Sequence, residues 1–320
     1  MHITICYHYT QGLHHDANVI KKTLCNYNVN TISYPERDLY VHNDECDSVK
    51  DNIVIFLEHI HSKYMKNKYC IFFPNNEHLN KYDIITMNKH IDIICCKSLN
   101  TESYIKTFID SRKVVYTGFV SLQTTIESCP KEEAFLHIKG VSSQKNTEIL
   151  VNTWLDNPSW PMLHIVQQND YEIKQDIIHD NIRITQRFLS RNKLSELISK
   201  YTFHICPSSK EGFGHSICEP LASGGIVITS DYSPMNEIIN SQCGNLIPPY
   251  LSCDEMGINS CTFEQINIEK AVEQCLGYSP EEIIEKQKFA TKQYINLHER
   301  FTHNIKAIIE LIYNDGAKNL

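Results

Sequence analysis

Residues 208–239 read SSKEGFGHSICEPLASGGIVITSDYSPMNEII, and this stretch combines two glutamates, a glycine turn and an apolar run. Glu211 and Glu219 are separated by seven residues, and Gly212 and Gly214 lie between them. Glycine allows a sharp turn and a close approach of the backbone to a ligand. A helix is expected after the turn, and its free N–H groups and positive dipole end favour a phosphate or diphosphate.

The two glutamates have different predicted partners. Glu219 lies on the expected helix, where a carboxylate can accept hydrogen bonds from two vicinal hydroxyls, as on a ribose. Glu211 lies in the turn, where a carboxylate can stabilise positive charge that develops at an anomeric carbon. Pro220 is expected in the first turn of the helix, where its missing N–H has no intrahelical partner to lose. The small residues 222–225 end the helix and keep it close to the sheet.

Short apolar runs alternate with longer amphipathic segments along the whole chain, a pattern typical of parallel sheets with crossover helices. The predicted fold is therefore α/β, with two doubly wound Rossmann-like domains that face a crevice. Residues 1–127 are expected to form the first domain and 128–301 the second, with a polar linker near 127–134. A C-terminal helix at about 302–320 is expected to pack back on the first domain.

The expected elements of the first domain begin with a strand at 2–9, a loop at Gly12 and a helix at 16–25. Residues 52–65 are predicted to form a helix that leads into the next strand. Further first-domain strands are expected at 69–75, 91–96 and 113–119. In the second domain, strands are expected at 134–140, 161–168, 201–208 and 224–230. Its helices are expected at 148–155, 194–200, 217–223, 268–275 and 281–295.

Composition excludes several classes of protein. The 320-residue chain has a net charge of −8 and a pI of about 6.0, which argues against a nucleic-acid binder. Its 13 cysteines form no framework and indicate free thiols in a reducing compartment. No run approaches the roughly 18 apolar residues of a membrane span. We therefore expect a cytosolic protein without a signal peptide or transmembrane segment.

No metal site is expected from the spacing of possible ligands. His14 and His15 are adjacent, and His59 and His61 are one residue apart, but no third and fourth ligands follow at useful spacing. A D-x-D motif is also missing.

The segment 202–239 resembles the retaining, nucleotide-sugar-dependent glycosyltransferases with the GT-B fold. Their pattern, P-S-x-x-E-G-F-G followed by E-A-x-A-x-G and V-I-x-x-D, corresponds here to PSSKEGFG, EPLASGG and VITSD. The strand, loop and helix from AFLHIKG to VNTW resemble the family segment that binds the donor diphosphate through an arginine and a lysine. Lys145 matches the lysine, while Gly140 stands where the family has the arginine.

The missing arginine leaves several substitutes open. Lys139, Arg183 and Arg187 are the candidates for the second charge, although lysine lacks the bidentate fork of arginine. Asn146 stands where the family usually has glycine, so the loop backbone is expected to differ.

The resemblance implies the following site. The catalytic residues are Glu211 and Glu219. The donor-binding residues are Gly12, Lys139, Lys145, Arg187, Phe188, Gly212, Phe213, Gly214, His215, Ser216 and Glu219. Gln186 is a further candidate beside the nucleotide base, and Phe188 has a core role as its alternative. The acceptor-side residues are Asn76, Glu77, His78, Lys97 and Ser121. Glu237, which follows Met235 and Asn236, is expected to support its loop.

The resemblance implies transfer of a hexose from a UDP- or GDP-sugar to a hydroxyl of a carbohydrate, glycoprotein or glycolipid, with retention of configuration and without cofactor or metal. Two alternatives stay open. One is another chemistry of the same fold, such as a sugar-nucleotide epimerase or hydrolase, or a transferase that modifies nucleic acid. The other is a non-catalytic subunit that binds a nucleotide sugar, an alternative that the missing arginine favours.

Overall fold

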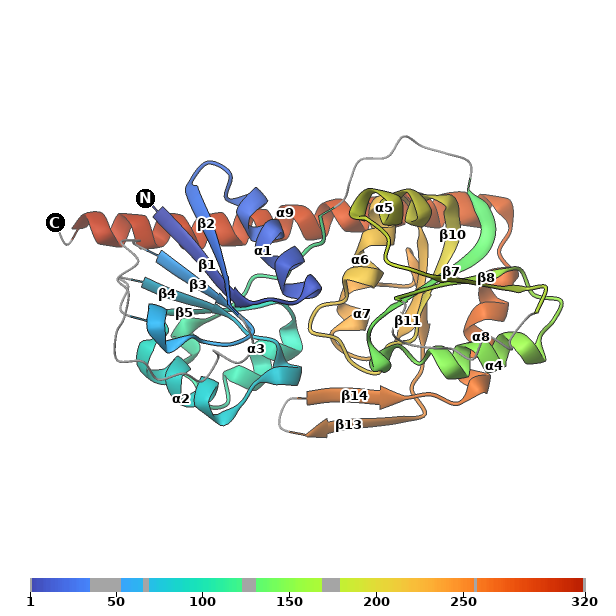
Figure 1. Ribbon diagram of the computed structural model, residues 1–320, viewed down its shortest axis with the longest axis horizontal. Helices are drawn as coiled ribbons and strands as arrows, with labels where there is room; N and C mark the ends of the chain where they lie inside the picture. The colour runs from blue at the N-terminus through green and yellow to red at the C-terminus, as the bar shows by residue number, and fades with distance from the viewer. Residues whose placement is uncertain are drawn as a thin grey trace. The chain divides into compact units, whose positions relative to one another are not determined.

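The computed structural model describes residues 2–34, 53–65, 69–122, 131–168, 179–255 and 258–318. The chain divides into two compact units, one comprising Met1–Leu122 with Leu297–Leu320 and the other Gln123–Asn296. The boundary expected at 127 and 128 lies outside the described residues. The last helix, α9 (Pro280–Lys318), is continuous and contributes to both units (Figure 1).

The first unit contains a six-stranded parallel sheet with the order β2-β1-β3-β4-β5-β6. Its strands are β1 (His2–His8), β2 (Asn28–Tyr34), β3 (Ile53–Leu57), β4 (Tyr69–Phe73), β5 (Ile93–Cys96) and β6 (Val114–Tyr116). Its helices are α1 (Gln11–Thr23), α2 (Lys81–His90) and α3 (Leu99–Ile105), with short 3-10 turns at Ser62–Tyr64, Asn76–His78 and Ser111–Lys113. The strand order reverses between β1 and β3, so the carboxyl ends of these two strands form a topological switch point.

The helix predicted over 52–65 is wrong, because residues 53–57 form β3 in the middle of the sheet. All five side chains of β3 are buried. A parallel strand covered on both faces is apolar throughout, and such a short run has no periodicity that separates it from a buried helix. The expected loop at Gly12 is also wrong, because Gly12 is the second residue of α1.

The second unit contains another six-stranded parallel sheet, with the order β12-β11-β10-β7-β8-β9. Its strands are β7 (Glu132–Gly140), β8 (Leu163–Gln167), β9 (Ile182–Gln186), β10 (Tyr201–Cys206), β11 (Ile226–Ser230) and β12 (Gly244–Ile247). A separate antiparallel pair comprises β13 (Leu251–Glu255) and β14 (Ile258–Thr262). Its helices are α4 (Thr147–Asp156), α5 (Arg191–Lys200), α6 (His215–Ala222), α7 (Met235–Ile238) and α8 (Gln265–Leu276).

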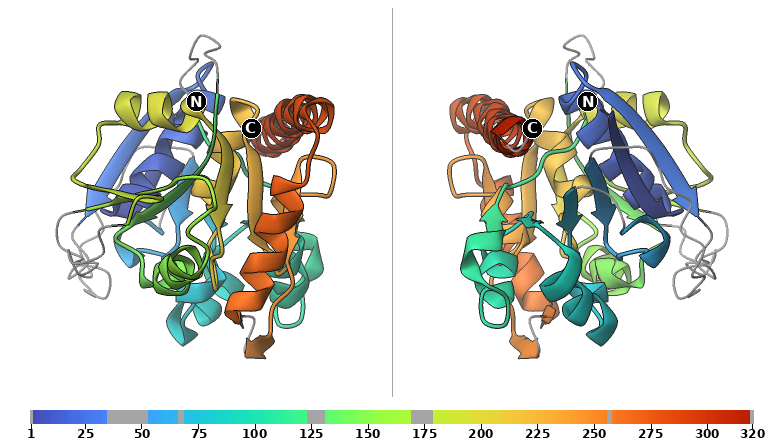
Figure 2. Two further views of the ribbon diagram at one scale, coloured as in Figure 1. Left: turned by 90° about the vertical axis from the view of Figure 1, so that its right-hand side faces the viewer. Right: turned by 90° about the vertical axis from the view of Figure 1, so that its left-hand side faces the viewer.

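Helices cover both faces of the second sheet. α4 and α8 pack together over one face, where Trp154 meets the ring of Phe135 edge-on at 5.1 Å and Phe135 stacks on Phe203 at 5.0 Å (Figures 1 and 2). α5 covers the other face, where Ile198 packs with Leu136. The two buried layers hold the strands rigidly, and the residues at the strand ends are therefore well placed to form a site.

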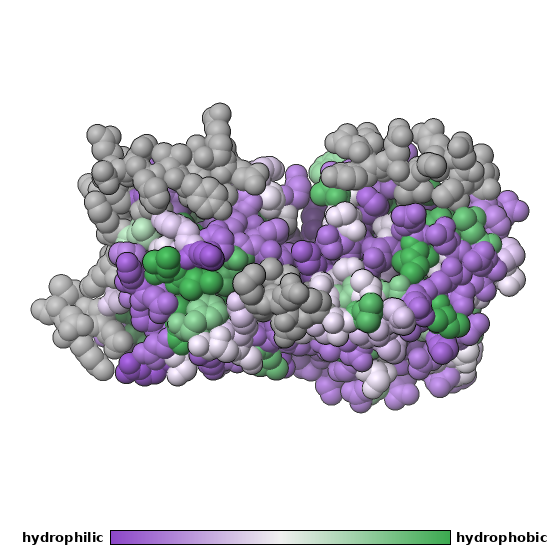
Figure 3. Space-filling view, turned by 90° about the horizontal axis from the view of Figure 1, so that it is seen from below, coloured by the Kyte–Doolittle hydropathy of each residue, from purple (hydrophilic) through white to green (hydrophobic). Residues whose placement is uncertain are grey.

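The surface is mainly hydrophilic in the view of Figure 3, with scattered hydrophobic patches. Within the described part of the chain, no helix combines the length and apolar character that a membrane crossing requires.

Candidate functional site

The loops that follow β7 and β10 meet at the switch point of the second sheet. β7 and β10 are neighbours, while the chain continues from β7 to one side of the sheet and from β10 to the other. The Ser209 N–H donates to Gln144 O at 2.8 Å and thereby joins the two loops. Ligands of doubly wound folds bind at this edge of the sheet, outside the carboxyl ends of the strands.

Asn146 connects these loops further and explains how the chain does without the family's glycine. Its backbone is left-handed, with a φ of 50°, and asparagine tolerates this conformation better than most residues do. Its Nδ2 donates to Pro207 O at 2.7 Å and to Ser209 Oγ at 2.9 Å. The asparagine side chain thus adds contacts between the loops that a glycine cannot make.

Lys145 contacts two other predicted site residues. Its Nζ forms an ion pair with Glu211 Oε1 and donates to Ser216 Oγ at 2.9 Å. The Lys145 and Glu211 side chains are only 12% and 15% exposed, so solvent screens their attraction weakly. The structure therefore places a cation, a carboxylate and a hydroxyl side by side at the start of α6.

The glycine turn before α6 is fixed by packing. Gly214 has a φ of 106°, and a Cβ added there would approach Ile217 Cδ1 to 3.0 Å. The neighbouring Phe213 is buried, and its ring meets that of His215 edge-on at 5.4 Å. Glycine is therefore required at 214, and His215 begins the helix in a defined position.

Pro220 lies deeper in α6 than expected. The helix begins at His215, so Pro220 is inside it and not in the first turn. A proline has no N–H, which leaves the carbonyl of Ser216 without its usual partner four residues ahead. The Cys206 thiol donates to this carbonyl at 3.4 Å, and burial raises the pKa of Cys206 to about 11. The strand residue thus replaces the hydrogen bond that the proline removes.

Glu219 has a partner that sequence reasoning missed. Arg191, the first residue of α5, places Nη2 at 2.6 Å from Glu219 Oε1. Glu219 is buried, whereas the Arg191 side chain is 40% exposed. The sequence gives only a weak signal for this pair, a basic residue at the start of a helix, where it opposes the helix dipole.

The candidates for the missing arginine lie in different places. Lys139 is half-buried near the end of β7, and burial lowers its pKa. Arg183 pairs in register with His164, well before the carboxyl end of β9. Arg187 is exposed just beyond that end. Lys139 and Arg187 therefore lie nearer to the ligand edge of the sheet than Arg183 does.

Phe188 does not belong to the core, because it is 62% exposed. It follows Gln186, the last residue of β9. An exposed aromatic ring beside the ligand edge is available for contact with a bound molecule. Glu237, in α7, accepts a hydrogen bond from Ser233 Oγ at 2.6 Å, which ties it to its own loop.

Gln167 is a second residue that the sequence did not single out. It ends β8, where it pairs in register with Gly140 on one side and Gln186 on the other. Its side chain is 1% exposed, and within the described residues neither amide atom has a hydrogen-bond partner. An unpartnered buried amide is costly, which makes this residue a candidate for contact with a ligand.

The predicted acceptor-side residues belong to the first unit. Asn76, Glu77 and His78 form a 3-10 turn after β4, with His78 Nε2 at 3.7 Å from Glu77 Oε1. Ser121 is fully buried, and Gly12 is exposed in the first turn of α1.

Lys97, a predicted acceptor-side residue, is paired with other residues of the first unit. It is buried, with Nζ at 2.5 Å from Asp16 Oδ2 and at 3.0 Å from Asn75 Oδ1. A buried ammonium requires such partners, and Lys97 uses its charge inside the unit.

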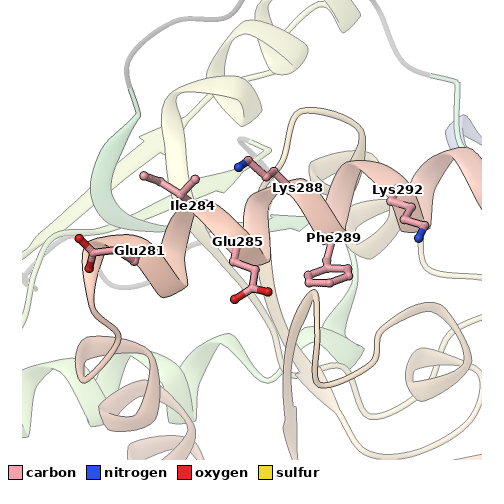
Figure 4. A pocket seen from close by; sticks show the side chains of 6 residues that line it. All are labelled: Glu281, Ile284, Glu285, Lys288, Phe289 and Lys292. Atoms are coloured by element: carbon pink, nitrogen blue, oxygen red, sulfur yellow. The ribbon is translucent and has the colours of Figure 1, made fainter.

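A surface hollow of 540 Å³ lies elsewhere, along α9. Figure 4 shows the side chains that line it. They are Glu281, Ile284, Glu285, Lys288, Phe289 and Lys292. None of them is a predicted site residue, and their mixed charges favour no particular ligand.

The fold is similar to that of solved glycosyltransferases. The two parallel six-stranded sheets match the architecture of GT-B glycosyltransferases. The sucrose-phosphate synthase of Thermosynechococcus elongatus superposes with a TM-score of 0.72 at 10% identity, over 98% of this chain and 100% of that one. A glycosyltransferase of Rickettsia africae gives a TM-score of 0.70 at 13% identity, with 98% of each chain covered. Anabaena HepE, solved in complex with UDP, gives 0.65 at 12% identity, over 98% of this chain and 100% of that one.

One family model matches part of the sequence, within the second unit. Residues 124–257 match the family model of the glycosyl transferases group 1. No curated protein sequence matches the chain significantly. The predicted GT-B fold is thus confirmed.

Proposed function

We propose that this chain is a retaining glycosyltransferase that moves a hexose from a UDP- or GDP-sugar to a hydroxyl of a carbohydrate, glycoprotein or glycolipid. The contact of Lys145 with Glu211 and Ser216 carries this proposal. It joins the phosphate-binding lysine and the sugar-side carboxylate of the family pattern at the switch point of the sheet.

The donor diphosphate would bind at the start of α6. Lys145 supplies a positive charge on a side chain that is 12% exposed, and the first N–H groups of the helix add the dipole that favours an anion. Lys139 lies at the end of the neighbouring β7 and is the proposed second cation. These groups would neutralise the diphosphate without a metal ion, so the proposed transfer uses no metal cofactor.

The nucleoside would extend toward the ends of β8 and β9. Glu219 accepts hydrogen bonds from the two ribose hydroxyls, with Arg191 orienting its carboxylate. Gln167 lies at the end of β8, which neighbours β7, and the segment Gln186–Phe188 lies at the end of β9, the next strand. The base would lie along this edge of the sheet. A glutamine amide has both donors and acceptors, as the edge of a nucleobase does.

The reaction would proceed through departure of the diphosphate. The bond between the anomeric carbon and the phosphate oxygen breaks, and the electron pair leaves with the diphosphate, whose charge Lys145 stabilises. The acceptor hydroxyl attacks the same face of the sugar and passes its proton to the leaving phosphate oxygen. When the phosphate draws Lys145 away, the Glu211 carboxylate becomes available to stabilise the oxocarbenium-like centre.

The first experiment is a thermal-shift screen of nucleotide sugars with the full chain. A ligand that binds the folded protein raises its apparent stability by mass action. UDP-sugars are the first set to test, because HepE was solved with UDP. A donor that binds is then incubated with the enzyme alone and with acceptor mixtures, and its products are separated.

The products distinguish the proposal from its alternatives. Transfer with retained anomeric configuration, lost in Glu211→Gln, supports the proposal. A changed sugar nucleotide formed from donor alone indicates an epimerase, and free sugar as the only product with every acceptor indicates a hydrolase. Binding without any turnover indicates a non-catalytic subunit.

A further inference from the structure

Two histidines and a glutamate converge at the switch point of the first sheet. His8 is the last residue of β1, and Glu58 and His59 directly follow β3, the strand next to β1. Their side chains are 9%, 9% and 12% exposed. This edge is where doubly wound folds bind ligands. The three residues belong to the first unit, and the candidate site described above belongs to the second.

The distances suit three ligands of one metal ion. His8 Nε2 lies 3.5 Å and His59 Nε2 lies 3.9 Å from the same atom, Glu58 Oε1. All three donor atoms lie within 4.8 Å of one another. Metal–ligand bonds of about 2.0–2.1 Å in a tetrahedral site separate the donors by about 3.4 Å. The side chains therefore need only small movements to bind an ion between them.

The hydrogen bonds around His59 orient it as a ligand. Its Nδ1 donates to Asp83 Oδ2 at 3.0 Å, while Asp83 Oδ1 accepts the Ile60 N–H at 3.2 Å. With the proton on Nδ1, the lone pair of a neutral imidazole is on Nε2, the atom that faces Glu58. In this tautomer two acceptor atoms face each other, and a cation between them stabilises the arrangement. Carboxylate–histidine–metal arrangements use the same geometry.

Glu58 is held in a strained backbone conformation. Its φ is 67°. The His59 N–H donates a hydrogen bond to Leu57 O at 2.8 Å, so residues 57–59 form a tight three-residue turn with Glu58 in the middle. Positive φ is costly for a residue with a Cβ, and such strain gathers at functional sites. The turn aims the Glu58 carboxylate at His8, and Asn75 Nδ2 donates to its other oxygen, Oε2, at 2.5 Å.

Electrostatics favour a divalent ion. Glu58 and Asp83 are buried carboxylates, 8% and 1% exposed. Burying charge is expensive unless it is neutralised. One divalent ion balances both carboxylates while His8 and His59 stay neutral, as metal ligation requires.

We propose that the first unit binds one transition-metal ion of the zinc class through His8 Nε2, Glu58 Oε1 and His59 Nε2. Asp83 and Asn75 orient these ligands from behind. Two imidazoles and one carboxylate form a set that zinc accepts, and the fourth position stays open to a water or hydroxyl oxygen. The spacing of possible ligands in the sequence does not indicate this site, because sheet pairing brings together residues that are fifty apart in the sequence.

The test measures Zn²⁺ binding to the chelator-treated full chain by calorimetry, together with the absorption spectrum of the Co²⁺ form. We expect one ion per chain and a Co²⁺ spectrum without thiolate charge transfer. Glu58→Gly removes the ligand and relieves the positive φ, so it should fold and lose at least about 100-fold in Zn²⁺ affinity. Asp83→Asn should weaken affinity about 10- to 100-fold, as loss of an orienting partner does.

His90→Ala is the matched control, because His90 is an exposed histidine of the same unit, at the end of α2. It should bind Zn²⁺ as the wild type does. The proposal is overturned if the wild type binds no Zn²⁺. It is equally overturned if Glu58→Gly binds as tightly as the wild type, or if the Co²⁺ spectrum shows thiolate ligation.

Discussion

Arg191 Nη2 lies 2.6 Å from Glu219 Oε1, so the carboxylate assigned to the ribose already has a cationic neighbour. The arginine side chain is 40% exposed, and such a pair contributes little to stability. Its effect on the site is orientation, because one carboxylate oxygen is held while the other can receive a ligand hydroxyl. A variant of Glu219 should therefore affect the donor more than a variant of Arg191 does, which gives the first prediction.

Glu219→Gln should weaken binding of the active nucleotide sugar by about tenfold or more, since each lost charge-assisted hydrogen bond costs about 1.5–3 kcal/mol. Arg191→Gln should change the affinity by no more than about threefold, because the carboxylate remains. Calorimetry with the donor identified by the screen measures both. An equal loss in the two variants would contradict this and would place Arg191 on the donor itself, as a substitute for the missing arginine.

The ion pair of Lys145 and Glu211 gives the second prediction. Lys145→Ala should lower kcat/KM by about 100-fold or more, because it removes charge stabilisation from the leaving diphosphate. Glu211→Gln should lower kcat by a similar factor with a smaller effect on donor affinity. Steady-state kinetics check both, with Lys200→Ala, an exposed lysine at the end of α5, as the control. The assignment fails if Glu211→Gln keeps full turnover.

The second unit was predictable where the chemistry is local. The segment 208–239 contains its strand end, glycine turn, helix and next strand in one continuous stretch, and each step has its own residue signal. The contact of Lys145 with Glu211 could be anticipated because loops after neighbouring parallel strands meet at one edge. Roles in binding and catalysis are not visible in the geometry alone and remain predictions.

The missed features depend on contacts between distant segments. The buried strand β3 looks like a helix when it is read alone, because its neighbours make every residue apolar. The pairing of Arg191 with Glu219 depends on how α5 and α6 pack against each other. Hydrophobic periodicity in the sequence does not predict this packing. The buried pair of Lys97 with Asp16 joins the end of β5 to α1, and the strand end alone does not predict this contact.

Gln167 gives the third prediction. Gln167→Leu should raise the free energy of unfolding by about 1–3 kcal/mol, because it removes a buried amide that has no partner within the described residues. If the amide contacts the base, the same variant should weaken donor binding about tenfold, and its affinities for UDP and GDP should differ less than those of the wild type do. Chemical denaturation and calorimetry measure the two effects. The neighbouring Gln168→Leu, which alters a half-buried glutamine, is the control. Unchanged nucleotide preference in Gln167→Leu would contradict a role in base contact.

Buried histidines of the second unit give the last prediction, a loss of stability in mild acid. Burial lowers the pKa of His137 to about 4 and that of His204 to about 3. The unfolded chain therefore binds more protons than the folded one below pH 6.5, and the free energy of unfolding falls as the pH falls. His137 alone should cost about 2 kcal/mol between pH 7 and 5.

The effect of His137 can be separated from general acid destabilisation by the slope of the free energy of unfolding against pH. Inside the fold, His137 Nδ1 contacts Ile205 O at 2.8 Å and Nε2 contacts Thr147 Oγ1 at 2.9 Å, so a glutamine can preserve one or both hydrogen bonds. Denaturation of His137→Gln at pH 7, 6 and 5 should show a smaller loss of stability than the wild type, whatever its stability at pH 7. The exposed His90→Gln should keep the wild-type slope. An identical pH dependence in His137→Gln and the wild type would mean that His137 is already charged in the folded chain, which contradicts its neutral burial.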